Sequence, residues 1–242
     1  MSKKPWNISA AECHIASRGG RGSARFSAAL FPLLLVLLCL LLSSCAVKKE
    51  VVIPQHEGAD LEKVLADLRQ VQVLNAALSV DYEKGDTIMS GDAALTLSSD
   101  ELSLRIYYLG FLAGEIKEDK GEVKSKPKLD KTRSAMLVNG LRNGFFWWNI
   151  KGYTITEDEQ QYVVRNSDRE ILVDKKSMLP TQQIIRMQGG DELVITYDMP
   201  ARIEEADRMP GSPSWMHFYQ SQMKIELKRY LVTVSVKSYA LK

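Results

Sequence analysis

The side chain whose position most clearly suggests chemistry is the thiol of Cys45. It follows an apolar run from residue 28 to residue 42 and the two small residues Ser43 and Ser44. A cysteine thiolate is a nucleophile, and at this boundary it could form a thioether. The run is about 15 residues long, short of the roughly 20 that a membrane-spanning helix needs. These features favour a secretion signal, residues 1–44, over a membrane span.

The residues around this run are arranged like those of a bacterial lipoprotein signal. Leu42-Ser43-Ser44-Cys45 resembles the lipobox, whose cysteine is diacylated before the signal is cleaved. The resemblance implies that Cys45 is lipidated and that its acyl chains hold the protein on a membrane without spanning it. The alternative is an ordinary buried helix in which Cys45 is incidental. Glu12 is the single acid before the run, and the bases there, as a signal peptide requires, are Lys3, Lys4, Arg18, Arg21 and Arg25.

The residue after the lipidated cysteine predicts which membrane carries the protein. In the Gram-negative sorting that this signal resembles, an aspartate there typically retains a lipoprotein in the inner membrane. This chain has Ala46 instead. The resemblance therefore implies that the protein lies on the periplasmic face of the outer membrane. The membrane is then its partner, contacted through the acyl chains.

Removal of residues 1–44 changes what the composition implies. It takes away five bases and one acid, so the formal charge changes from +2 to about −2. An acidic balance argues against nucleic acid as a partner. Cys13 and Cys39 leave with the signal, so no pair of cysteines remains for a disulfide. The remaining length suffices for one domain with a substantial core.

Residue types for catalysis or metal binding are sparse. Neither His56 nor His217 has a second histidine nearby, and the sequence has no H-E-x-x-H, G-x-S-x-G or Walker-type glycine loop. We therefore predict no catalytic residues, no metal and no cofactor. Acidic groups at 157–159 and 204–205 leave a carboxylate-only hydrolase as an open alternative, although solvated charge in turns explains them equally well.

The spacing of apolar residues predicts the elements. Residues 45–58 read as the lipidated cysteine and a tether. A helix from Asp60, its N-cap, follows, with an apolar stripe of Leu61, Val64, Leu65, Leu68 and Val71. Alternating residues then predict about ten antiparallel strands. Two segments interrupt them: a charged loop over 117–131 and a second helix over 132–143, capped by Thr132 or Ser134.

The order of these elements resembles the lipoprotein carrier LolA and the outer-membrane acceptor LolB. The local resemblance lies in Tyr108-Leu109-Gly110, in the helix 134–144 with tryptophans after it, and in the segment 171–184 with Leu179-Pro180. It implies an α+β fold over 59–242: a strongly curved antiparallel sheet, an open half-barrel, with helices plugging its concave face. No internal repeat is found, and we expect a monomer.

The resemblance also implies an apolar cavity that receives acyl chains. Its predicted lid and mouth are Met136, Leu137, Leu141, Phe145, Phe146, Trp147 and Trp148, and its predicted lining is Leu78, Val80, Leu95, Leu104 and Ile106. The alternative is that all of these residues are ordinary core. The exposed apolar loop of LolB is matched by residues 109–114, which predicts a membrane-inserting tip of Leu109, Phe111 and Leu112. Continuation of a strand explains this segment equally well.

Three functions follow from these observations. The first is a lipid-anchored protein that binds an acyl chain or a lipoprotein and assists its transfer or insertion. The second is an accessory lipoprotein that docks a protein partner through an exposed edge strand or the 200–214 loop. The third is a hydrolase that uses a carboxylate pair. A large cavity would favour the first function, and a filled sheet with an exposed apolar patch would favour the second.

Overall fold

Twelve strands and two α-helices make up the part of the chain that the structure describes. The structure is a computed structural model and describes residues 55–56 and 59–242. The predicted signal peptide, Cys45 and most of the tether lie outside these residues. The elements are α2 (Leu61–Leu68), β1 (Val73–Lys84), β2 (Thr87–Ser98), β3 (Glu101–Tyr108), β4 (Phe111–Asp119), β5 (Glu122–Lys126), α3 (Lys131–Phe145), β6 (Thr154–Glu157), β7 (Gln161–Arg165), β8 (Arg169–Asp174), β9 (Pro180–Arg186), β10 (Glu192–Arg202), two short 3₁₀ helices (Glu205–Asp207 and Ser214–His217), β11 (Phe218–Leu227) and β12 (Tyr230–Leu241).

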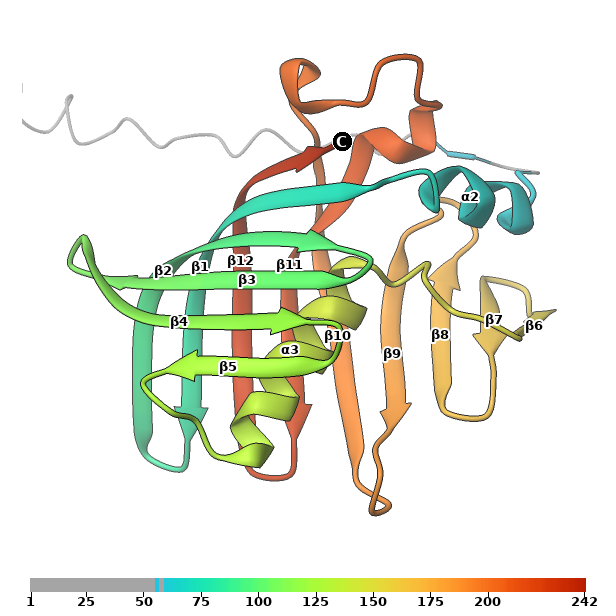
Figure 1. The fold of residues 1–242 in the computed structure, drawn as a ribbon. Coiled ribbons are helices and arrows are strands. Elements are labelled where there is room, and N and C mark those ends of the chain that lie inside the picture. The colour runs from blue at the N-terminus through green and yellow to red at the C-terminus, as the bar shows by residue number, and fades with distance from the viewer. Residues whose placement is uncertain (1–54, 57–58) are drawn as a thin grey trace, which may run out of the picture. The chain divides into compact units, whose positions relative to one another are not determined.

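All twelve strands belong to one antiparallel sheet with the order β5-β4-β3-β2-β1-β12-β11-β10-β9-β8-β7-β6. Neighbours in sequence pair within β1–β5 and within β6–β12, and the first and last strands pair in the middle of the sheet. The sheet curves strongly around α3 and stays open, with β5 and β6 as its two edges (Figure 1). The α+β fold with an open half-barrel is therefore confirmed.

Alternation along the strands places one face of the sheet in the core. In β1, Leu74, Ala76, Leu78 and Val80 are buried, while the residues between them are more exposed. Side chains on a strand point alternately to opposite faces, so the buried set shares the concave face with α3. The apolar stripe of α2 joins the same core, and Asp60 caps this helix as predicted, its carboxylate accepting from the Glu62 amide at 2.9 Å.

The charged segment 117–131 differs from its prediction as a loop. Strand β4 runs through to Asp119, and β5 returns from Glu122, so the sheet has twelve strands and not about ten. Of the residues in these two strands, only Ile116 is buried. An edge hairpin needs little apolar surface, and charged side chains on an edge hinder pairing with another chain. The lysines that suggested a solvated loop therefore occupy an edge.

The second helix was predicted nearly in place but with the wrong cap. It runs from Lys131 to Phe145, and its N-cap is Asp130, not Thr132 or Ser134. The Asp130 carboxylate accepts a hydrogen bond from the backbone N–H of Arg133 at 2.9 Å. A carboxylate at this position satisfies an unpaired backbone donor and interacts favourably with the helix dipole.

Helix α3 packs directly on the sheet at a glycine. A methyl group on Gly140 would lie 2.6 Å from Cγ2 of Ile225 in β11, closer than van der Waals contact allows. Ile225 is completely buried and cannot swing aside easily. The close approach of helix and sheet therefore depends on the absence of a side chain at position 140.

Gly140→Ala is expected to lower the free energy of unfolding by up to about 2 kcal/mol. Alanine gains about 1 kcal/mol of helix propensity over glycine, but overpacking a core costs about 1 to 3 kcal/mol. Urea denaturation would measure the difference. The double variant Gly140→Ala with Ile225→Ala should lose less stability than the sum of the losses in the two single variants. A stabilised Gly140→Ala variant would contradict the packing.

Candidate functional site

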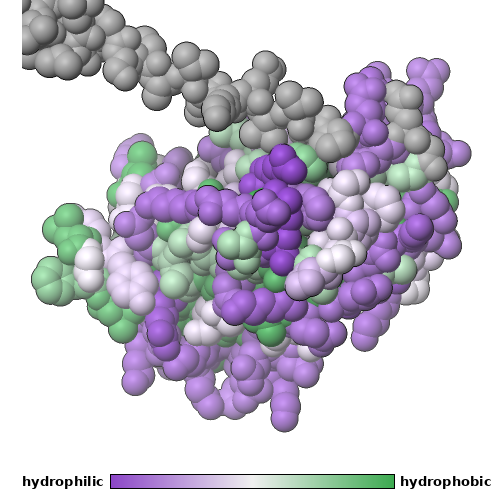
Figure 2. All heavy atoms as spheres, turned by 90° about the horizontal axis from the view of Figure 1, so that it is seen from above, coloured by the Kyte–Doolittle hydropathy of each residue, from purple (hydrophilic) through white to green (hydrophobic). Residues whose placement is uncertain are grey.

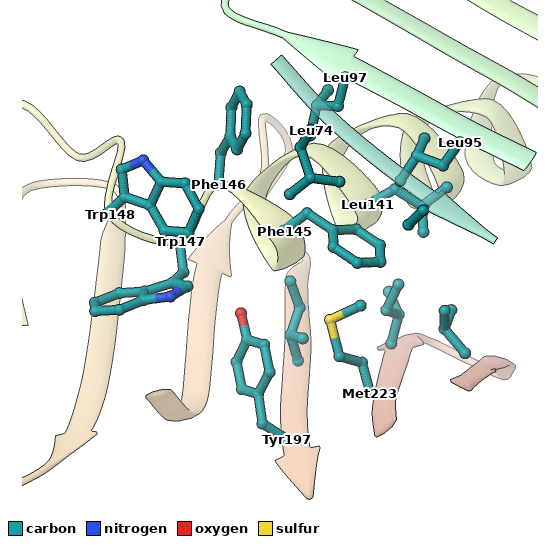
Figure 3. Close-up of a cluster of buried hydrophobic side chains, with 14 of the residues drawn as sticks. Leu74, Leu95, Leu97, Leu141, Phe145, Phe146, Trp147, Trp148, Tyr197 and Met223 are labelled. Carbon is teal, nitrogen blue, oxygen red and sulfur yellow. The ribbon is translucent and has the colours of Figure 1, made fainter. Parts of the chain in front are cut away.

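The seven residues predicted as lid and mouth are buried along α3 and just after it. Their exposed fractions run from 0% for Met136 to 9% for Leu137. Figure 3 shows Leu141 and Phe145 among the leucines of β1 and β2, with Trp147 and Trp148 beyond the helix end. Phe146 and Trp148 pack with ring centroids 5.3 Å apart, and Trp147 lies edge-on to Trp148 at 5.9 Å. These side chains form packed core, and their contact with a ligand stays a prediction.

The cavity beside this aromatic run is small. Its volume is about 30 Å³, and Phe145, Trp147 and Trp148 are among its lining residues. Trp215 and Gln220 also line it, and Trp215 Nε1 and Gln220 Oε1 are buried without a hydrogen-bond partner among the described residues. Such a volume with polar groups in its wall suits one ordered water. It is far too small for an acyl chain.

A buried arginine holds the end of α3 in place. Arg169, at the start of β8, donates to the carbonyl oxygens of Asn143 at 3.0 Å and Trp147 at 3.1 Å. Its Nε also donates to Gln183 Oε1 at 2.7 Å. Burial lowers the pKa of Arg169 to about 10, so the side chain remains charged at neutral pH. A cation at a helix C-terminus stabilises the unpaired carbonyls there.

Two further polar side chains complete this buried network. The Gln183 amide donates to the Asn143 carbonyl at 2.9 Å and to the Tyr197 hydroxyl. The Tyr197 hydroxyl donates to the Gly144 carbonyl at 3.0 Å, and burial raises its pKa. The network was not predicted from the sequence. It fixes the aromatic run, so its role is structural.

The five predicted lining residues divide into two groups. Leu78, Leu95 and Leu104 are buried to 1% exposure or less and belong to the hydrophobic core. Val80 and Ile106, farther along the same strands, border an open groove together with Leu137 of α3. The structure therefore brings three of the twelve predicted ligand-binding residues to one open site.

This groove lies between the inner face of β1–β4 and the first turns of α3, and its volume is about 690 Å³. Tyr82 pairs with Met89 and Val80 with Gly91 across β1 and β2, so these residues share one face. Most of the wall is apolar. The lining residues are Val80, Tyr82, Ile88, Met89, Ser90, Gly91, Ile106, Tyr107, Tyr108, Ala113, Leu129, Arg133 and Leu137.

An exposed apolar hairpin adjoins the groove. The turn between β3 and β4 consists of Leu109 and Gly110, both in the left-handed region with φ of 50° and 83°, as a two-residue hairpin turn requires. Leu109 is 82% exposed, Phe111 79% and Leu112 59%. Figure 2 shows apolar side chains gathered at the end of the molecule where this turn projects. The predicted membrane-inserting residues thus lie together on a hairpin turn, and insertion itself stays a prediction.

The described residues offer neither a metal-binding cluster nor a membrane-spanning helix. No group of three or more His, Cys, Asp or Glu side chains in residues 55–56 and 59–242 could hold a metal ion. Nor does this part of the chain contain a helix with the length and hydropathy needed to cross a membrane.

No family model matches this chain, and no curated protein matches it. Two solved structures are similar in fold. The crystal structure of a DUF1329 family protein from Desulfovibrio piger aligns with a TM-score of 0.46 and 10% identity, over 79% of this chain and 94% of that one. A domain described as a candidate outer membrane lipoprotein-sorting protein, from Vibrio parahaemolyticus, aligns with a TM-score of 0.45 and 8% identity, over 76% and 94%. These values do not assign the chain to a family.

Proposed function

We propose that this protein binds an acyl chain, carried by a lipid or a lipoprotein, in the groove between α3 and β1–β4. The observation that supports this proposal is a largely apolar groove of about 690 Å³ that opens beside an exposed apolar hairpin. Sites for small ligands commonly have volumes of about 300 to 1,000 Å³ and mostly apolar walls. Each methylene that leaves water for such a wall contributes about 0.8 kcal/mol.

The proposal includes a membrane anchor and a direction of transfer. Acyl chains on Cys45 would hold the protein, a monomer, on the periplasmic face of the outer membrane. The hairpin tip of Leu109, Phe111 and Leu112 would contact the lipid surface, and the groove would pass its acyl chain onward down a gradient of affinity. Transfer of this kind needs no catalytic residue, metal or cofactor.

A second function is supported by a different feature of the same surface. Ile88, Met89, Tyr108, Leu109, Phe111 and Leu112 are large apolar residues that are each more than half exposed. A contiguous exposed patch of this kind is typical of a protein–protein contact as well as of a lipid contact. An accessory lipoprotein that docks a partner protein here is the alternative function.

Met89→Glu is expected to weaken binding of decanol by about tenfold or more. Met89 lines the groove and is 64% exposed, so the substitution places a charge beside the bound chain without disturbing the core. Affinity would be measured by displacement of the fluorescent probe N-phenylnaphthylamine from residues 46–242. This segment retains the sheet, both helices and their core.

Met199→Glu is the matched control. Met199 is 45% exposed and does not line the groove, so decanol affinity should stay at the wild-type value. If wild-type protein binds neither the probe nor decanol, acyl-chain binding is wrong and docking of a partner becomes the better account. Equal loss in the two methionine variants would place the bound chain somewhere other than this groove.

A further inference from the structure

Two polar atoms are buried in the wall of the apolar groove. The hydroxyl oxygen of Tyr82 and Nε of Arg133 have no hydrogen-bond partner among the residues that the structure describes. Nε of Arg133 lies 3.0 Å from Asp130 Oδ2, an ion-pair contact without a hydrogen bond. Burying an unpaired donor carries a free-energy cost, so two of them in one groove require an explanation.

Three cationic side chains lie beside the rings of Tyr82 and Tyr230. The Arg133 guanidinium carbon lies 5.7 Å from the centroid of the Tyr82 ring, and Tyr82 stacks on Tyr230 at 6.1 Å. Lys84 Nζ and the Arg229 guanidinium carbon lie 5.5 Å and 5.7 Å from the Tyr230 centroid. Asp130 is the acid in ion-pair contact with Arg133, so three cations gather near one carboxylate. This part of the groove is therefore electrostatically suited to an anion.

Both unpaired groups are hydrogen-bond donors at neutral pH. Arginine carries only donors, and it remains charged. Burial raises the pKa of the Tyr82 hydroxyl above its ordinary value although the neighbouring Arg133 lowers it, and the net rise keeps the proton on this oxygen. A ligand that satisfies both groups must therefore bring an acceptor, and an anionic oxygen makes the stronger hydrogen bonds.

We infer that the ligand of the groove is an anionic amphiphile. Its chain lies against Val80, Ile106 and Leu137, and its carboxylate or phosphate oxygens accept hydrogen bonds from Tyr82 and Arg133. This inference rests on the proposed acyl-chain function and adds the chemical class of the head group.

Decanoate, decyl phosphate and decanol separate the head group from the chain, because all three carry the same alkyl chain. Their affinities for residues 46–242 at pH 7.5 would be measured by displacement of N-phenylnaphthylamine. We expect at least one of the two anions to bind about tenfold more tightly than decanol, as one charge-assisted hydrogen bond would provide. Preference for decanoate indicates a fatty carboxylate, and preference for decyl phosphate indicates a lipid phosphate.

Two variants test whether Arg133 and Tyr82 cause the preference for an anion over decanol. Arg133→Met should lose the preference for the anion over decanol, and Tyr82→Phe should reduce this preference. Arg105→Met is the control, because Arg105 is an arginine that contacts an acid, Glu115, as Arg133 contacts Asp130, and does not line the groove. If Arg133→Met does not fold, the inference is still tested by Tyr82→Phe and by the affinities of wild-type protein for the three amphiphiles.

The outcomes separate this inference from the proposed function. Equal binding of all three amphiphiles to wild-type protein would overturn the head-group assignment and leave acyl-chain binding intact. A preference that survives both Arg133→Met and Tyr82→Phe would also overturn it. Binding of none of the three would overturn acyl-chain binding and the head-group assignment together.

Discussion

Replacing Arg169 with methionine is expected to lower the free energy of unfolding by about 3 to 5 kcal/mol. Arg169 is 7% exposed, and its guanidinium serves acceptors on three separate segments. The carbonyl oxygens of Trp147 and Asn149 and Oε1 of Gln183 would lose a donor. Each buried acceptor left without a partner costs about 1 to 3 kcal/mol, and methionine fills the space without replacing any donor.

The effect should extend from stability to the position of the aromatic run. The Asn143 carbonyl keeps its bond from the Gln183 amide, so the helix end itself is still partly held. The Trp147 carbonyl loses its charged donor. We therefore expect altered near-ultraviolet circular dichroism from Trp147 and Trp148 in addition to a lower urea midpoint.

Arg165→Met is the matched control for this measurement. Arg165 also lies on the β7–β8 hairpin, but its side chain is 57% exposed and forms an ion pair with Glu170 at 2.6 Å. Exposed ion pairs contribute less than about 1 kcal/mol. If the two arginine variants lost equal stability, the buried network would not be what holds this end of α3.

The local rules of sequence reading predicted the sheet well, because alternation depends only on neighbouring residues. The antiparallel strands were predicted from their alternation, and the stripe of α2 was predicted with its cap. The β4–β5 hairpin was missed because alternation reports burial, and an edge hairpin buries almost nothing. Lysine and glutamate are typical both of a solvated loop and of a protected sheet edge, so they do not distinguish the two.

The site was only partly predictable, because it depends on how far each strand extends beyond α3. Leu78 and Val80 have the same alternation and similar chemistry, yet Val80 borders the groove and Leu78 does not. No local pattern distinguishes them. Arg169 could have been found, since it has the inward parity of the buried Ile171 and Val173 and a charged residue at such a position needs partners.

Removing the apolar side chains of the β3–β4 turn is expected to weaken binding to lipid vesicles by at least about a hundredfold. The variant combines Leu109→Asn, Phe111→Thr and Leu112→Thr. Each large apolar side chain that leaves water contributes about 1.5 to 3 kcal/mol, so three of them dominate the affinity of an unlipidated segment. Asparagine accepts the left-handed backbone of Leu109, and threonine is well suited to strands, so the hairpin should persist.

Co-sedimentation of residues 46–242 with vesicles of phosphatidylethanolamine and phosphatidylglycerol would measure this affinity. The control combines Val123→Thr and Met199→Asn, which remove exposed apolar side chains outside the turn and should leave vesicle binding unchanged. Asparagine also accepts the left-handed backbone of Met199. Because the three turn residues are exposed, the free energy of unfolding should change by less than about 1 kcal/mol. Undiminished vesicle binding by a folded turn variant would contradict insertion, and the hairpin would then be better explained as the docking surface for a protein partner.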